Sequence, residues 1–330
     1  MPGNAPPPAA GKRLITRRRV LAGVGGVMGA GVVGVGGVWA YDQAGRFGRS
    51  AERLVPDHRV RRSPLLPSMV IARGVDPALN VRAAVTKLGG MAELVGPDDI
   101  VVVKPNIGWD RTAAQGANTH PHVVSEVVRL CREARAGRVI VSDCPIGKSM
   151  RAFERSGILG AARDAGAEVI VPEESRYYRV QISERLGVWD ILEPFVIATK
   201  VINVPVVKHH DLAGITGGLK NWIGITGKLR ISFHGDLQRS IAELAALMRP
   251  TLTIMDASRV LMGNGPGGGS LDDVKPVHSI AAGTDPVALD AWAAGLFAGI
   301  ELPDNLRIAE EMGLGRRDFA SLSPVEVAGG

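Results

Sequence analysis

The chain has 330 residues and a formal net charge of +6, a balance that by itself favours an acidic partner such as nucleic acid. Five of the positive charges lie in residues 1–40, which contain no acid, so the rest of the chain carries a net charge of only +1. This distribution excludes nucleic-acid binding as the main function. The only cysteines are Cys131 and Cys144, too few for an iron–sulfur cluster or for a structural zinc site built from cysteines.

The N-terminus has the pattern of an export signal. Residues 16–21, Thr-Arg-Arg-Arg-Val-Leu, resemble the twin-arginine motif, and residues 20–40 carry no charge over a length that could span a bilayer. Eight glycines lower the hydrophobicity of that segment, as in twin-arginine signals. We therefore expect residues 1–40 to be a signal or membrane anchor read by the twin-arginine translocase, and the protein to act in the periplasm or at the outer face of the membrane. Cleavage after Ala40 and membrane contact through residues 20–40 both remain open.

Residues 41–67 contain six arginines and three prolines and are predicted to be a solvated linker. Residues 68–330 are predicted to form a single α/β domain, a mainly parallel β-sheet flanked by helices and built from βαβ units. Its strands are runs of β-branched residues without alternation, which is typical of strands buried on both faces. In chain order we expect a strand at 69–72, a helix at 78–95, a strand at 100–103, a helix at 122–134, a strand at 139–141, a helix at 151–165, strands at 169–171 and 201–204, a helix at 237–248, and strands at 252–255 and 279–282.

Polar residues follow most of these strands. Lys104 and Asn106 follow the strand at 100–103, Asp143 follows the next one, Asp256 follows the strand at 252–255, and Asp285 follows the last. Thr284-Asp285-Pro286 is itself predicted to begin a helix, with an N-cap and a proline in the first turn. Ligand sites of open parallel sheets lie outside the carboxyl ends of the strands. We therefore expect one edge of the sheet to gather these side chains.

Residues 203–234 form the richest polar segment, with three of the seven histidines and three lysines, among them Lys208 and Lys220, in a glycine-rich stretch. A desolvated lysine beside another cation has a lowered pKa and can act as base or nucleophile, while a neutral histidine can bind a metal or move protons. A basic loop exposed to solvent is the alternative interpretation. The glycine loop at 263–269 lacks the features of a phosphate-binding loop and is predicted to be a mobile flap or a plain turn.

As a set, several motifs resemble the family called domain of unknown function 362, over about residues 68–300. They are Lys104-Pro105-Asn106, Thr119-His120-Pro121, Ser156-Gly157-Ile158, Lys208 with His210, Leu219-Lys220-Asn221 with Gly224, Gly263-Asn264-Gly265-Pro266, and Asp285-Pro286 through Asp290. The resemblance implies a fold and a ligand site more than a reaction. Some members of that family carry an added iron–sulfur module, whose cysteines this chain lacks.

The order His210, Lys220, His234 is also distantly similar to the nickel-pincer lactate racemase family. That resemblance implies His210 as the proton-transfer group, Lys220 as a tether for a cofactor, and His234 as a metal ligand. A second acid/base histidine of that family is replaced here by residues 143–145, Asp-Cys-Pro, so racemisation with two bases is not implied.

Taken together, the sequence favours an enzyme outside the cytoplasm that acts on a small anionic substrate, in the manner of a racemase or epimerase, with a metal or a lysine-tethered cofactor. The alternative is a protein that binds a small anion or a metal without catalysis. Candidate catalytic residues are His210, Lys220 and Lys208; candidate substrate-binding residues are Lys104, Asn106, Asn221, Asn264 and Asp256; the candidate metal ligand is His234.

Overall fold

The computed structural model describes residues 52–227 and 230–330, which form one compact unit. The predicted signal or anchor at residues 1–40 lies outside the described residues. Within the described part of the chain, no helix is long and apolar enough to cross a membrane.

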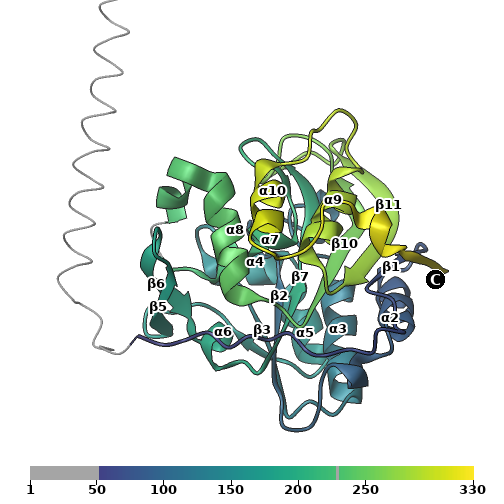
Figure 1. The fold of residues 1–330 in the computed structure, drawn as a ribbon, viewed down its shortest axis with the longest axis horizontal. Helices are drawn as coiled ribbons and strands as arrows, with labels where there is room; N and C mark the ends of the chain where they lie inside the picture. The colour runs from purple at the N-terminus through teal and green to yellow at the C-terminus, as the bar shows by residue number, and fades with distance from the viewer. Residues whose placement is uncertain (1–51, 228–229) are drawn as a thin grey trace, which may run out of the picture. The chain divides into compact units, whose positions relative to one another are not determined.

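A ten-stranded sheet forms the centre of the fold, in the order β12-β1-β11-β10-β7-β2-β3-β4 with β8 and β9 attached beside β10 (Figure 1). Strands β10, β7, β2, β3 and β4 run parallel to one another, which confirms the predicted α/β fold with a mainly parallel sheet. The strands are β1 (Met69–Arg73), β2 (Ile100–Pro105), β3 (Arg138–Ser142), β4 (Glu168–Ile170), β7 (Lys200–Val204), β8 (Val206–His210), β9 (Gly214–Thr216), β10 (Leu252–Leu261), β11 (Val274–Gly283) and β12 (Val325–Ala328).

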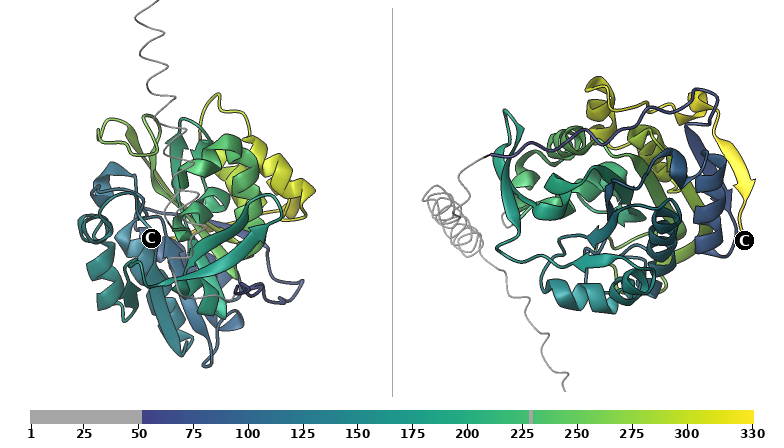
Figure 2. Two further views of the ribbon diagram at one scale, coloured as in Figure 1. Left: turned by 90° about the vertical axis from the view of Figure 1, so that its left-hand side faces the viewer. Right: turned by 90° about the horizontal axis from the view of Figure 1, so that it is seen from below.

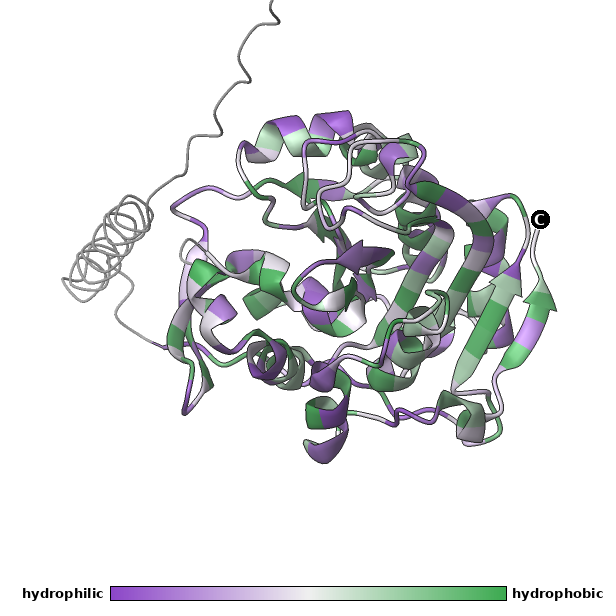
Figure 3. Ribbon diagram, turned by 90° about the horizontal axis from the view of Figure 1, so that it is seen from above, coloured by the Kyte–Doolittle hydropathy of each residue, from purple (hydrophilic) through white to green (hydrophobic). Residues whose placement is uncertain are grey.

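Helices cover both faces of this sheet (Figures 1 and 2). Val101 packs against the helices of one face and Val102 against those of the other, which is why β2 is apolar without alternation. Figure 3 shows green, apolar stretches on both strands and helices, with purple stretches between them. The first face holds α2 (Pro77–Lys87), α3 (Pro121–Glu133), α4 (Ser149–Arg155) and α5 (Ile158–Asp164); the second holds α6 (Glu193–Ile197), α7 (Gly218–Asn221), α8 (Leu237–Met248), α9 (Pro286–Ala294) and α10 (Asp304–Glu311).

The direction of β11 corrects one expectation about the site. This strand runs antiparallel to both of its neighbours, β1 and β10, and its last residue, Gly283, pairs with Thr253 near the start of β10. Residues 284–285 therefore lie at the opposite edge of the sheet from the carboxyl ends of the parallel strands. Asp285 caps α9, as the helix start predicted at Thr284-Asp285-Pro286 requires, and accepts a hydrogen bond from the Ala288 amide at 2.8 Å.

Several boundaries also differ from expectation. The helix expected at 78–95 ends at Lys87, because Gly89 and Gly90 both have positive φ, and the helix expected at 151–165 is divided into α4 and α5 by Gly157 at φ 77°. A hairpin of β5 (Tyr177–Ser183) and β6 (Gly187–Leu192) was not predicted.

Residues 52–67 pack on the domain rather than standing free as part of the linker expected at 41–67. His58 is buried, its carbonyl accepts a hydrogen bond from Thr251 Oγ1 at 2.6 Å, and Arg53 forms a β-bridge to Val180. The part of this segment from residue 52 onward therefore belongs to the compact unit.

Candidate functional site

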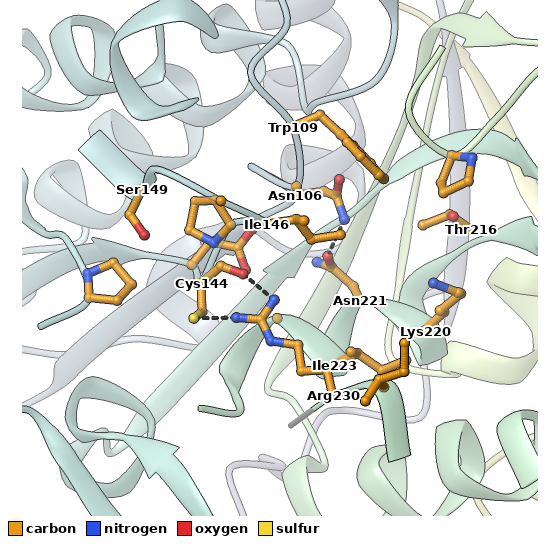
Figure 4. A pocket seen from close by; sticks show the side chains of 18 of the residues that line it. Asn106, Trp109, Cys144, Ile146, Ser149, Thr216, Lys220, Asn221, Ile223 and Arg230 are labelled. Carbon is orange, nitrogen blue, oxygen red and sulfur yellow. Dashed lines mark hydrogen bonds between the residues drawn. The ribbon is translucent and has the colours of Figure 1, made fainter. Parts of the chain in front are cut away.

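A cavity of about 720 Å³ opens at the carboxyl ends of the parallel strands (Figure 4). Asn106 reaches it directly after β2, Asp143 directly after β3, and Lys208 from β8. This is the edge that the polar residues after the strands predict. Further lining residues come from α7 and from two 3₁₀ helices, η3 (Trp222–Ile225) and η4 (Arg230–Asp236): Lys220, Asn221, Ile223, Arg230, Ile231 and His234.

A network of five polar side chains forms the floor of this cavity. The Lys104 ammonium donates to Asp143 Oδ1 at 2.7 Å and to Asn221 Oδ1 at 3.0 Å, and Asn106 Nδ2 donates to Asn221 Oδ1 at 2.9 Å. Lys208 Nζ donates to Asn106 Oδ1 at 3.0 Å. The network joins residues of four separate segments, so the cavity floor is held by the tertiary fold. We call these five residues the polar network.

A second set of hydrogen bonds fixes the start of α7, the short helix that carries Lys220. The carboxylate of Asp290, on α9, accepts from the amides of Gly218 at 2.5 Å and Leu219 at 3.0 Å, and Asn203 Nδ2 donates to the Gly218 carbonyl. Burial raises the pKa of Asp290 to about 7, against the opposing effect of these amide hydrogen bonds. Lys220 is therefore positioned by the last quarter of the chain as well as by its own segment.

Two lysines of the cavity have amines without an acidic partner among the described residues. Lys220 is partly exposed, and burial lowers its pKa to about 8. Lys208 is fully buried; burial, and then the nearby charge of Lys220, hold its pKa well below the usual 10.5. Burial therefore disfavours the charged form of both amines.

His210 has a defined tautomer. Its Nδ1 accepts hydrogen bonds from the amides of Leu212 at 3.2 Å and Ala213 at 3.3 Å. Burial and the neighbouring charge of Lys220 lower the pKa of the ring to about 3, so the imidazole is neutral and its proton is on Nε2. The free side of the ring is therefore a hydrogen-bond donor.

Arg230 and Cys144 form a contact at the cavity wall that the sequence interpretation missed. The Arg230 guanidinium donates to the Cys144 carbonyl at 2.6 Å and to its sulfur (Figure 4). Tyr177 Oη lies 3.3 Å from the same sulfur. Burial raises the pKa of the Cys144 thiol, so it stays protonated in spite of the guanidinium. The sequence feature that could have pointed to this contact is the position of Cys144, directly after Asp143 at the end of β3.

Three predicted substrate-binding residues do not line the cavity. Lys104 is fully buried beneath it as the ion-pair partner of Asp143. Asp256 is also fully buried, because β10 continues past it to Leu261, and it accepts hydrogen bonds from the His120 amide and from Ser258.

The third, Asn264, lies in the loop at 263–269 and donates to the carboxylate of Asp273 at 3.0 Å. From this loop it is Pro266 that lines the cavity. The predicted residues that the structure does bring together around the cavity are Asn106, Lys208, His210, Lys220, Asn221 and His234.

A lysine-tethered metal cofactor fits the donor set in two respects. The Lys220 amine is free of acidic partners among the described residues, and His234 lines the same cavity. Across 52–227 and 230–330, no cluster of three or more histidine, cysteine or acidic side chains could hold a metal ion.

The fold and the cavity define an α/β protein with a cavity at the carboxyl edge of its parallel strands, where such folds bind ligands. The chain belongs to the family described as domain of unknown function, DUF362, whose model matches residues 101–295. This confirms the family that the motifs predict.

A thylakoid-associated protein of Synechocystis sp. is 29% identical to the chain over 220 residues, which cover 64% of this chain and 67% of that protein. Among solved structures, the lactate racemase apoprotein of Thermoanaerobacterium thermosaccharolyticum matches 74% of this chain and 62% of its own, with a TM-score of 0.42 and 13% identity. A Thermotoga maritima protein matches 72% of this chain and 60% of its own, with a TM-score of 0.41 and 13% identity. The chain thus spans about three fifths of the length of these two structures.

Proposed function

We propose that this protein is an enzyme that binds an anionic substrate in the cavity and moves a proton on it, as racemases and epimerases do. The observation that carries the proposal is the amine of Lys220, which faces the cavity without an acidic partner among the described residues and has a pKa of about 8. Near neutral pH such an amine exists in both protonation states. It can hold an anion as an ammonium ion and accept a proton as a free amine.

The groups beside Lys220 can donate hydrogen bonds to a substrate oxygen that gains negative charge during the reaction. His210 presents a neutral Nε2–H, and Lys208 lies within the same wall of the cavity. Fixed donors of this kind stabilise the charge that develops when a proton leaves the carbon beside a carboxylate or carbonyl group. In this proposal His210 acts as a donor, and Lys220 is the base.

Solvent exchange tests the proton transfer. A set of short 2-hydroxy and 2-oxo acids is incubated with the protein in deuterium oxide. NMR follows the loss of the C2 proton of the 2-hydroxy acids and of the C3 protons, beside the ketone, of the 2-oxo acids. We expect exchange with the wild-type protein and a loss of about 100-fold or more in Lys220→Met, as for removal of a general base. Lys275→Met, at an exposed position, is the matched control.

Calorimetry tests the binding step separately. Since an anion beside Lys220 raises the pKa of its amine, binding at pH 9 should take up a proton, seen as a heat that depends on the ionisation enthalpy of the buffer. Lys220→Met should lose this uptake. Binding with no buffer dependence would contradict the assignment of Lys220 as the anion-binding group.

The second candidate function is non-catalytic capture of a small anion, which the same unpaired lysines favour. Binding without solvent exchange would support capture over catalysis. Intact-mass and metal analysis of protein purified from its own export route adds a further distinction, because a covalent adduct on Lys220 supports an enzyme with a tethered cofactor. A metal held there would act as a Lewis acid on the substrate oxygen.

We also propose that the protein acts outside the cytoplasm, at or near a membrane. The support is the twin-arginine pattern at residues 16–21, together with the thylakoid association of the Synechocystis relative. A reporter fused after residue 67 should be exported by the wild-type leader and retained in the cytoplasm by Arg17→Lys/Arg18→Lys. Export of both fusions would contradict use of the twin-arginine translocase.

A further inference from the structure

The cavity is much larger than a small anion requires. A carboxylate of about six non-hydrogen atoms occupies roughly the space of six waters, about 180 Å³, whereas the cavity has a volume of about 720 Å³. Pockets of this size ordinarily enclose ligands with several times as many atoms. Most of the space is therefore available to a part of the ligand that the lysines do not contact.

Two basic side chains of the cavity are more buried than several of its apolar side chains. Lys208 and His210, at its buried end, are 1% and 6% exposed. Trp109, Ile146 and Ile223 line the same cavity, and Figure 4 shows their side chains around that of Asn221. A ligand that fills the cavity thus meets the lysine and histidine groups in the buried part and apolar side chains beyond it, where Asp211, Arg230 and His234 also line the cavity.

The exposed end of the cavity carries an apolar rim, which we define as Ile146, Leu212 and Ile231. Their exposed fractions are 56%, 63% and 74%, and all three line the cavity. They come from the loop between β3 and α4, the turn between β8 and β9, and η4. Single exposed apolar residues are ordinary, but three from separate segments around one cavity mouth mark a binding surface for an apolar group.

We propose that the ligand of this site is an amphiphile, an anion with an apolar tail. The anionic head lies at Lys208 and Lys220, and the tail follows Trp109 and Ile223 toward the apolar rim. This inference rests on the proposed function for its anionic head, and adds the class of substrate.

A series of saturated carboxylates below their micelle concentrations tests the tail. Calorimetric affinities of acetate, hexanoate and decanoate are compared at pH 7. Burial of each methylene in the cavity should raise the affinity about threefold to fourfold. Binding of the long acids should also show a negative heat-capacity change.

Variants of the cavity and one neutral ligand test where the head and the tail of the ligand bind. Lys220→Met should weaken decanoate about tenfold or more, and decanol should bind more weakly than decanoate to the wild-type protein. Ile231→Ser should flatten the rise in affinity with chain length. Leu271→Ser, at an exposed apolar position outside the cavity, should leave that rise unchanged.

The outcomes separate the two proposals. Acetate binding that depends on Lys220, with no gain along the series, would overturn the amphiphile and leave the proposed function standing. Absence of binding by every anion would overturn both. Decanoate binding that is equal in Lys220→Met would show adsorption elsewhere on the apolar surface, and would also overturn the inference.

Discussion

Replacing Lys220 with methionine should stabilise the protein while it removes anion binding. Burial lowers the pKa of this lysine from 10.5 to about 8, and each pKa unit corresponds to about 1.4 kcal/mol. The charged amine therefore costs the folded protein roughly 3 kcal/mol at pH 7. Methionine has a similar length and carries no charge. We expect Lys220→Met to raise the free energy of unfolding at pH 7 by about 1–3 kcal/mol, measured by urea denaturation.

The pH dependence separates this cause from better packing. Between pH 8 and 10.5 the unfolded state holds more protons on Lys220 than the folded state does, so the wild-type protein gains stability as the pH rises through this window. The advantage of Lys220→Met should therefore shrink toward zero by pH 10.5. Lys275→Met controls for the loss of an exposed lysine. A Lys220→Met variant that is less stable than wild type at pH 7, or whose advantage is constant with pH, would refute this reasoning.

Three other changes test the site. Asp143→Asn should lower the free energy of unfolding in urea by about 3 kcal/mol, because the Lys104 ammonium, 2.7 Å away, loses its buried partner. The double variant Lys104→Met/Asp143→Leu should recover much of this stability, and no recovery would argue against the ion pair as the cause. Gly224→Ala should lower the thermal midpoint, since the added methyl would meet Asp143 and lie 2.8 Å from Lys104 Nζ; an unchanged midpoint would contradict the tight packing of the polar network. His210 should remain neutral at pH 5 with its proton on Nε2, because burial and Lys220 lower its pKa to about 3; nitrogen NMR showing a ring that titrates near pH 6 would contradict this.

The sequence located the strands because burial on both faces leaves a readable pattern. Val101 and Val102 face opposite layers of helices, so the run at 100–103 is apolar throughout. The direction of a strand leaves no such pattern. The apolar run at 279–282 would have the same pattern whether the strand were parallel or antiparallel to β10. For this reason Asp285 was expected at the wrong edge of the sheet.

Within the site, residues that directly follow a strand were predictable and long-range partners were not. Asn106 was expected at the cavity because it follows β2. Arg230 was missed because its contact, Cys144, lies 86 positions away in the chain. Asp256 was misplaced because β10 continues beyond it, with an irregular register after Ala257, so that its carboxylate is enclosed by the sheet.

The polar network has a consequence for how this family can diverge. Each of its members is the hydrogen-bond partner of another, from Lys104 and Asp143 to Asn106 and Lys208. A substitution at any one of them leaves a buried polar group without its hydrogen-bond partner. A tolerated substitution there therefore requires a second, compensating substitution in the network. The apolar rim is free of that constraint because its side chains are exposed and come from separate loops. New ligand preferences should therefore arise by substitutions in the apolar rim, while the residues of the polar network stay unchanged together.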